Sequence, residues 1–496
     1  MMLAWPRNPV IYEINTWVWL RELSRKYGRA VDLGSVPPDE WDQLSSLHCD
    51  AVWLMGVWQR SAAAIRQIAA DENRLNRLRQ ALEGFTPEDL VAPPFSIRRY
   101  RADPLLGGPE GLAAAREQLA LRGIRLVLDF VPNHVAPDHL WVTEHPEFFL
   151  QGRDEDRHAN PGAFLNLENG TFACGRDPNY PPWQETLQLN LFHPELRAAT
   201  GELLLEIAGQ CDGLRCDMAM LAINEVFEEN WGHLAGRPPE EEYWPGLLSA
   251  VQSQIPGFLF IAEAYWSREV ELQQQGFHYC YDKILYDVLR TGDVEAVRTH
   301  LQTIYAHQQK LIRFVENHGE ERAAAVFPGA RNQAATLVAA LTPGAKLIHQ
   351  GQREGRLRKH PLLLGRWAEE GTDEELKAFH ERLSAAFQAE EIHSGNWRLC
   401  ELQEDADHPG SRNILAWCWW WEDHRFLVLV NFSGLPSRGQ VLLPWTDLED
   451  RVWNLFDMFS NRLYTRTGAE MSQSGLSLDL APWEFHLFRF YNLSPW

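Results

Sequence analysis

Polar residues that could do chemistry stand near the ends of four short apolar segments of the sequence. The segments are LVLDFVPNH, GLRCDM, FIAEAYW and FVENHGEER, and their candidate residues are Asp129, Asn133, His134, Arg215, Asp217, Glu263, Asn317 and His318. Two carboxylates suit chemistry at an acetal carbon, because one can attack the carbon while the other protonates the leaving oxygen. Any one such residue is more often a helix cap or a loop hydrogen-bonding group, so the prediction rests on the whole set.

The four segments belong to a longer series of apolar, β-branched or aromatic runs, which alternate with amphipathic helical stretches. This alternation is typical of βα units around a parallel sheet. Eight such runs predict a (β/α)₈ TIM barrel, in which the active site lies at the carboxyl ends of the strands. The runs span residues 10–14, 51–58, 124–131, 213–218, 258–266, 277–285, 310–318 and 345–351.

Two parts of the chain depart from this alternation. Residues 135–189 are rich in aromatic residues, Pro and Gly, and are too long for an ordinary loop, so we expect a small excursion domain after the third strand. Residues 395–496 lose helical periodicity and read as short strands between turns, which predicts a C-terminal antiparallel β-sandwich. The barrel is then formed by residues 1–134 and 190–390.

The composition is that of a globular protein, with 45% hydrophobic and 23% charged residues in a chain of 496. Its net charge of −22 argues against nucleic acid and anionic membrane surfaces as partners. No apolar stretch reaches the roughly 20 residues that span a bilayer. Seven scattered cysteines without CxxC spacing argue against a disulfide framework or a zinc site. We therefore expect a soluble cytoplasmic protein.

In their order and spacing, the four segments resemble the four signature regions of the α-amylase family of retaining glycoside hydrolases. The segments VWLMGVW, LQLNLFHPELR and KLIHQGQREG are also similar to segments of that family, so the resemblance covers most of the chain. It implies that Asp217 is the nucleophile and Glu263 the general acid/base. It implies no cofactor, and its expected partners are an α-glucan, a maltooligosaccharide or a small α-glucoside.

Other residues would support these two carboxylates. Arg215 lies two residues before Asp217, so both side chains face the same side of a strand, and the guanidinium should keep the carboxylate ionised. By resemblance, His134 and His318 would donate hydrogen bonds to sugar hydroxyls, and Asp129 and Asn133 would support this shell.

The fourth segment departs from the family, whose pattern there reads Asn-His-Asp. Gly319 occupies the position of the Asp, which grips sugar hydroxyls near the transition state. Losing one such contact typically lowers the rate by about 10²–10³. Glu320 and Glu321 follow at once, but a neighbouring residue on a strand end points in another direction.

Two further departures bear on the substrate and on metal binding. In PPFSIRRY, Phe95 would keep the stacking face of a family Tyr but lose its hydroxyl. Typical α-amylases carry a Lys-His pair where this chain has Met220 and Leu221, and that pair serves the calcium site. We therefore expect no metal and no calcium-dependent, secreted endo-amylase.

Two hypotheses remain open. The first is an active enzyme that hydrolyses or transfers α-linked glucosyl units, since water or a sugar can release the same covalent intermediate. The second is a catalytically impaired glucan-binding or regulatory protein on the same fold. The retained carboxylates, arginine and histidines favour the first hypothesis, and Gly319 favours the second.

Overall fold

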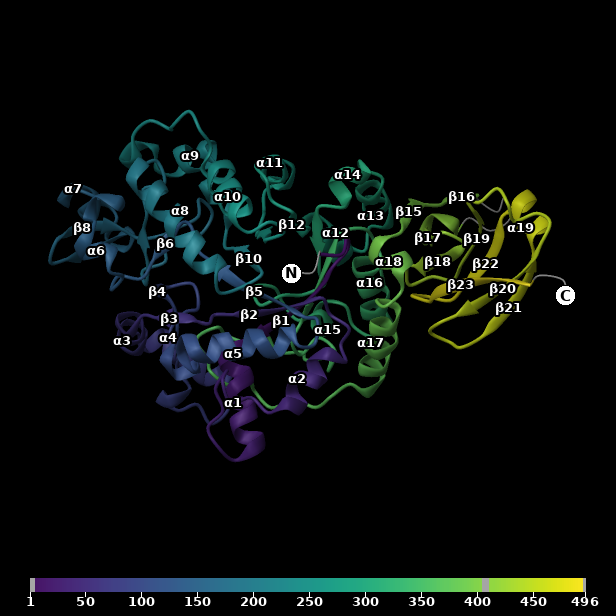
Figure 1. Cartoon of the computed structure of the whole chain (residues 1–496), viewed down its shortest axis with the longest axis horizontal. Helices are drawn as coiled ribbons and strands as arrows, with labels where there is room; N and C mark the ends of the chain where they lie inside the picture. Colours follow the sequence, from purple (N-terminus) through teal and green to yellow (C-terminus); the bar gives the residue numbers. More distant parts are fainter. Residues whose placement is uncertain (1–4, 404–409, 494–496) are drawn as a thin grey trace.

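The fold is centred on a closed barrel of eight parallel strands in a computed structural model that describes residues 5–403 and 410–493 (Figure 1). The order around the barrel is β1-β14-β13-β12-β11-β10-β5-β2, so sequential barrel strands are neighbours and the predicted TIM barrel is confirmed. Each of the eight predicted runs supplies one strand. The strands are β1 (Val10–Asn15), β2 (Ala51–Met55), β5 (Arg125–Phe130), β10 (Gly213–Cys216), β11 (Leu259–Ala262), β12 (Tyr279–Tyr281), β13 (Leu311–Arg313) and β14 (Ala345–His349).

Helices connect the barrel strands, and most of them bury apolar side chains. In α5, for example, Leu112, Ala115 and Leu119 are buried at helical spacing. The Asn15 side chain accepts from the Val18 N–H to start α1, directly after β1. The connecting helices are α1 (Thr16–Tyr27), α2 (Pro38–Ser45), α5 (Gly108–Ala120), α8 (Pro194–Ala208), α9 (Asn224–Ala235), α10 (Tyr243–Gln254), α11 (Glu269–Gln274), α12 (Lys283–Thr291), α13 (Val294–Leu301), α14 (Tyr305–Gln308), α15 (Ala323–Val326) and α16 (Ala330–Ala340).

Two insertions interrupt the barrel at the carboxyl ends of β2 and β5. The first, between β2 and α5, holds the antiparallel pair β3 (Trp58–Arg60) and β4 (Ile97–Ala102) with α3 (Ala62–Ala69) and α4 (Glu72–Ala81) between them. The second lies at one end of the molecule, away from the C-terminal sheets (Figure 1). It contains β6 (His134–Val135), α6 (Trp141–Glu144), α7 (Asp154–Ala159), β7 (Phe164–Leu167), β8 (Gly170–Ala173) and β9 (Leu187–Gln188).

The C-terminal region forms two antiparallel sheets, as the sequence predicts. Helices α17 (Glu374–Ala386) and α18 (Glu390–Ser394) lead from the barrel to a six-stranded sheet, β15-β17-β18-β23-β20-β21, and a three-stranded sheet, β16-β19-β22. The strands are β15 (Asn396–Leu399), β16 (Glu401–Gln403), β17 (Ile414–Trp421), β18 (His424–Asn431), β19 (Ser437–Leu442), β20 (Val452–Asp457), β21 (Leu463–Thr467), β22 (Leu476–Leu480) and β23 (Phe485–Leu493), with α19 (Gly468–Ser474) before β22.

The position of β17 explains why its sequence, ILAWCWWW, does not alternate between apolar and polar residues. Ala416 and Cys418 belong to the core between the two sheets. The indole N–H groups of Trp417 and Trp419 both donate to the carbonyl of Leu341 in the barrel, at 2.6 and 2.7 Å. Both faces of the strand are therefore covered, which fixes the C-terminal sheets against the barrel.

Candidate active site

The two predicted carboxylates meet on one guanidinium at the carboxyl ends of β10 and β11. Arg215 Nη1 lies 2.6 Å from Asp217 Oδ1, and Arg215 Nη2 lies 2.6 Å from Glu263 Oε2. All three side chains are buried, with Arg215 only 1% exposed. Because the two terminal nitrogens of a guanidinium are about 2.3 Å apart, the contacted carboxylate oxygens are at most about 7.5 Å apart. This upper limit is compatible with the separation of about 5–5.5 Å that a retaining mechanism needs.

Glu263 has the surroundings of a group that holds a proton. Burial and the charge of Asp217 raise the pKa of Glu263 above its ordinary value, although Arg215 opposes them. Glu263 Oε2 also accepts from the Met218 N–H at 2.7 Å, and Oε1 accepts from the Tyr265 hydroxyl at 3.0 Å. Met218 has a left-handed backbone (φ 43°), so the chain turns sharply directly after β10 and Asp217.

His318 is positioned by a carboxylate that the sequence analysis missed. Its Nδ1 lies 2.5 Å from Oε1 of Glu13, a completely buried residue of β1. Burial alone would raise the pKa of Glu13, but the adjacent His318 and His349 outweigh burial and lower it. Glu13 is therefore ionised at neutral pH. The signal was present in the sequence, because Glu13 is the only charged residue in the apolar run VIYEI.

Phe95 closes the same site from the first insertion. Its ring centre lies 5.3 Å from that of His318 and 5.1 Å from the guanidinium carbon of Arg215. Trp53 of β2 lies on the guanidinium as well, at 5.3 Å. These rings shield the cation from water and strengthen its interaction with the two carboxylates.

Asp129 and Asn133 hold neighbouring segments in place around the site through hydrogen bonds. Asp129 accepts from the Trp53 indole at 3.1 Å and from the Gly56 N–H at 2.8 Å, and burial raises its pKa to about 6. Gly56 itself has a left-handed backbone, with φ +76°. Asn133 Oδ1 accepts from Nε2 of Gln188 at 2.9 Å, which ties the end of β5 to the second insertion.

His134 lies at the root of the second insertion, where it begins β6 and packs against Trp183 with ring centres 5.0 Å apart. Burial lowers its pKa to about 4, against opposing effects of Glu185 and the Phe95 backbone. His134 is therefore neutral at pH 7 and can donate one ring N–H. The structure thus brings Asp217, Glu263, Arg215, His318 and Phe95 together, with His134 beside Phe95.

The departure at Gly319 forms a turn held by its neighbours. Asn317 Oδ1 accepts from the N–H groups of Gly319 and Glu320 at 2.8 and 3.1 Å, and Lys359 Nζ donates to the Gly319 carbonyl at 2.5 Å. Glu320 Oε1 lies 3.5 Å from Lys283 Nζ, and it lines a small cavity together with His318. The Glu321 carboxylate is 62% exposed and lies 3.9 Å from Lys359.

Among residues 5–403 and 410–493, no group of three or more His, Cys, Asp or Glu side chains is arranged to hold a metal ion. Over the same residues, no helix combines the length and the apolar character that crossing a bilayer requires.

Comparisons with known proteins find two relatives by sequence and an agreement in fold with solved structures. No protein-family model matches the sequence. The chain is 24% identical over 443 residues to α-amylase MalA of Haloarcula japonica, a match that covers 88% of this chain and 57% of that protein. It is 25% identical over 190 residues to the trehalose synthase/amylase TreS of Mycolicibacterium smegmatis, covering 34% of this chain and 31% of that protein. The chain thus spans about half the length, or less, of these relatives.

The fold comparison agrees over almost the whole chain. An α-amylase from Lactobacillus plantarum superposes with a TM-score of 0.67 at 18% identity, covering 98% of this chain and 99% of that one. These findings confirm the family resemblance that the four signature segments predict.

Proposed function

We propose that this chain, a member of the α-amylase family, cleaves α-glucosidic bonds by a retaining mechanism with a covalent glycosyl-enzyme intermediate. The observation that carries the proposal is the single guanidinium of Arg215 bound to both Asp217 and Glu263 at 2.6 Å. This contact holds the two carboxylates side by side, and burial together with the charge of Asp217 raises the pKa of Glu263, as a general acid requires.

Asp217 is the proposed nucleophile. Arg215 donates to its Oδ1 at 2.6 Å and fixes the side chain, which leaves Oδ2 to attack the anomeric carbon. Glu263, with its raised pKa, protonates the leaving glycosidic oxygen and then removes a proton from the molecule that attacks the intermediate. The Tyr265 hydroxyl fixes the orientation of this carboxyl group through its contact with Oε1.

The remaining predicted residues form the proposed sugar-binding wall. Phe95 offers an apolar face to the ring of the sugar whose bond is cleaved. His318, held by Glu13, and the neutral His134 are placed to donate hydrogen bonds to its hydroxyl groups. Recognition then depends on stacking and on hydrogen-bond donors, which suits an α-glucan, a maltooligosaccharide or a small α-glucoside.

The acceptor of the second step is water or another sugar. The names of the two relatives, an α-amylase and a trehalose synthase/amylase, support substrates ranging from glucan chains to a glucosyl disaccharide. We place the protein in the cytoplasm, since its seven cysteines are all free thiols.

A second function is favoured by Gly319, which offers no side chain where the family pattern has Asp. On this view the barrel binds glucans without turning them over. Long incubations of the purified protein with maltooligosaccharides, glycogen and α-glucosyl disaccharides, followed by chromatography of the products, test both proposals. Hydrolysis and transfer give different product series. Unchanged substrates, together with binding measured by calorimetry, would leave the second function. Asp217→Asn is the matched inactive control.

A further inference from the structure

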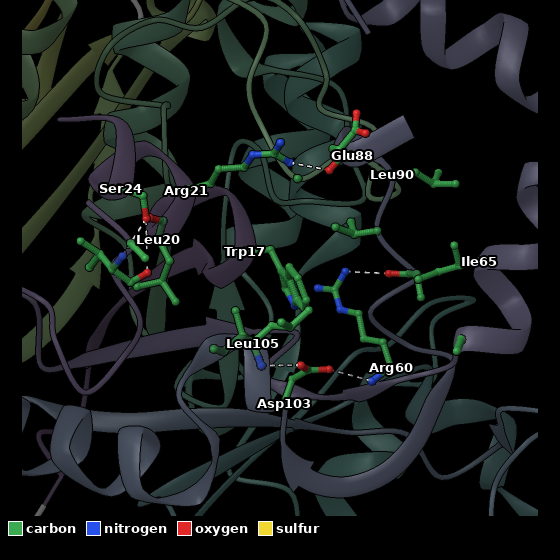
Figure 2. A pocket seen from close by; sticks show the side chains of 17 residues that line it. Trp17, Leu20, Arg21, Ser24, Arg60, Ile65, Glu88, Leu90, Asp103 and Leu105 are labelled. Carbon is green, nitrogen blue, oxygen red and sulfur yellow. Dashed lines mark hydrogen bonds between the residues drawn. The ribbon is translucent and has the colours of Figure 1, made fainter. Parts of the chain in front are cut away.

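A second cavity lies outside the proposed active site, on the flank of the barrel beside α1. Its volume is about 530 Å³, which is within the usual range for small-molecule sites. It is bounded by α1, α3, residues 88–92 and the 3₁₀ turn η2 (Pro104–Leu106), as Figure 2 shows. None of its lining residues belongs to the proposed catalytic set.

The walls of this cavity are mainly apolar, with Leu20, Ile65, Leu90 and Leu105 on its sides. Leu105 is 77% exposed at the rim, an unusual position for a large apolar side chain. Trp17 lies in the middle of the group, and one face of its ring is covered by the Arg60 guanidinium at 4.9 Å (Figure 2). The walls therefore suit a ligand with an apolar body.

Arg60 is a buried cation without a counter-ion. The residue is 7% exposed, and its side-chain partners are two carbonyls: Nη1 donates to Ala92 at 2.6 Å and Nη2 to Gly56 at 3.3 Å. Its Nε has no partner, and within the described chain the guanidinium forms no ion pair with a carboxylate. Burial lowers the pKa of Arg60 to about 9, so the buried charge is destabilised at neutral pH.

The charges of Asp103 and Asp129 offset the burial of Arg60 only in part, and neither carboxylate forms an ion pair with its guanidinium. Asp103 Oδ1 accepts from the Leu105 N–H at 2.9 Å, and its Oδ2 accepts from the backbone N–H of Arg60, not from its guanidinium. Glu88 is at the edge, and its backbone carbonyl accepts from Arg21, a second cation that lines the cavity. An oxyanion entering the cavity would complete the surroundings of Arg60.

We propose that this cavity is a binding site for a small organic anion, whose carboxylate or phosphate group pairs with Arg60 and whose apolar body lies against the leucine walls and Trp17. The inference does not depend on the proposed glycosidase activity. A neutral sugar is disfavoured, because the ring face that it would stack on is already covered by Arg60.

Calorimetric titration with three probes tests the site: 3-phenylpropionate, its neutral amide and inorganic phosphate. We expect saturable binding of 3-phenylpropionate in the millimolar range and binding of the amide that is weaker by about tenfold or more. Phosphate should compete with 3-phenylpropionate, since it needs only the charged part of the site.

Variants locate the binding. Leu105→Asp, at an exposed position that should not affect folding, places a negative charge on the wall and should weaken 3-phenylpropionate binding by about tenfold or more, whereas Leu105→Lys should retain it. Leu121→Asp puts the same charge just past the other end of α5, where Leu121 is 71% exposed, and should change nothing. Arg60→Gln, checked for folding by its Tm, should remove the preference for the carboxylate over the amide.

Equal affinity of the wild-type protein for the carboxylate and the amide would overturn the proposal. So would an absence of saturable binding up to about 10 mM, a concentration at which even weak ligands of this size are detected. Unchanged 3-phenylpropionate affinity in Leu105→Asp would show that the anion binds elsewhere, which also rejects this site.

Discussion

Replacing Gly319 by Asp should raise kcat/KM, because the other proposed groups are already assembled around Arg215. Gly319 does not have a left-handed backbone, so an L-residue is tolerated there. A Cβ atom at this position would meet Asn317 Oδ1 at 3.3 Å, which is close, so Asn317 must move by a few tenths of an ångström. The same oxygen holds the N–H groups of Gly319 and Glu320, and the movement weakens both hydrogen bonds.

The expected gain follows from two opposing effects. One restored transition-state contact contributes about 10²–10³ in rate, or about 2.7–4 kcal/mol. The crowding of Asn317 costs about 1.4 kcal/mol, which is a tenfold loss. The net expectation is therefore an increase in kcat/KM of about 10- to 100-fold. Lys359, which donates to the Gly319 carbonyl, would help to keep the new carboxylate ionised.

Initial rates with α-glucosyl fluoride and with maltotriose measure this effect. Gly319→Ala isolates the steric cost, and Gly319→Asn adds the shape of the side chain without its charge. A Gly319→Asp protein no faster than Gly319→Asn would refute the reasoning. A Glu320→Gln variant tests the alternative that Glu320 already replaces the family Asp. Because Glu320 pairs with Lys283, we expect this variant to keep most of its activity. A loss of activity of about 10² or more would support the alternative.

Three other predictions follow from the site. Asp217→Asn and Glu263→Gln should each abolish activity on maltooligosaccharides, and α-glucosyl fluoride should rescue only Glu263→Gln, since fluoride leaves without protonation; equal rescue would contradict the assigned roles. Glu13→Gln should destabilise the fold by about 3–5 kcal/mol at pH 7, as measured by urea unfolding. Because folding lowers the pKa of Glu13, this stabilisation is present above the unfolded pKa and is lost as the pH falls through the folded pKa. The free energies of unfolding of the wild type and the variant should therefore converge in acid. A difference that stays constant with pH would exclude the ion pair. A chelator should leave the Tm unchanged, and a fall of several degrees would reveal a structural ion.

Local patterns in the sequence predict the barrel well. In each strand the apolar residues either alternate with polar ones or form a continuous run that is buried on both faces. Both patterns can be recognised in the local sequence, without knowledge of distant partners. The pairing of Arg215 with Asp217 can also be predicted from the sequence, because residues two apart on a strand face the same side. The roles of these residues in catalysis remain predictions.

Contacts between distant segments could not be predicted. Glu13 meets His318 from the far end of the chain, and nothing near either residue specifies the other. The hydrogen bond from the Met218 N–H to Glu263 depends on how β10 and β11 end beside each other. The indole contacts of β17 with Leu341 likewise arise only after the C-terminal sheets dock on the barrel.

Gly56 links the proposed active site to the cavity beside α1, because its N–H and its carbonyl bind to different sides. Its N–H donates to Asp129 beneath the proposed active site. Its carbonyl accepts from Arg60 and Trp17, which line the cavity beside α1. A Cβ atom here would lie 2.5 Å from Arg60 Nη2 and 3.0 Å from Pro94, the residue before Phe95. A side chain at residue 56 would therefore disturb both sites at once, and we expect the effects of mutations at the two sites to be non-additive.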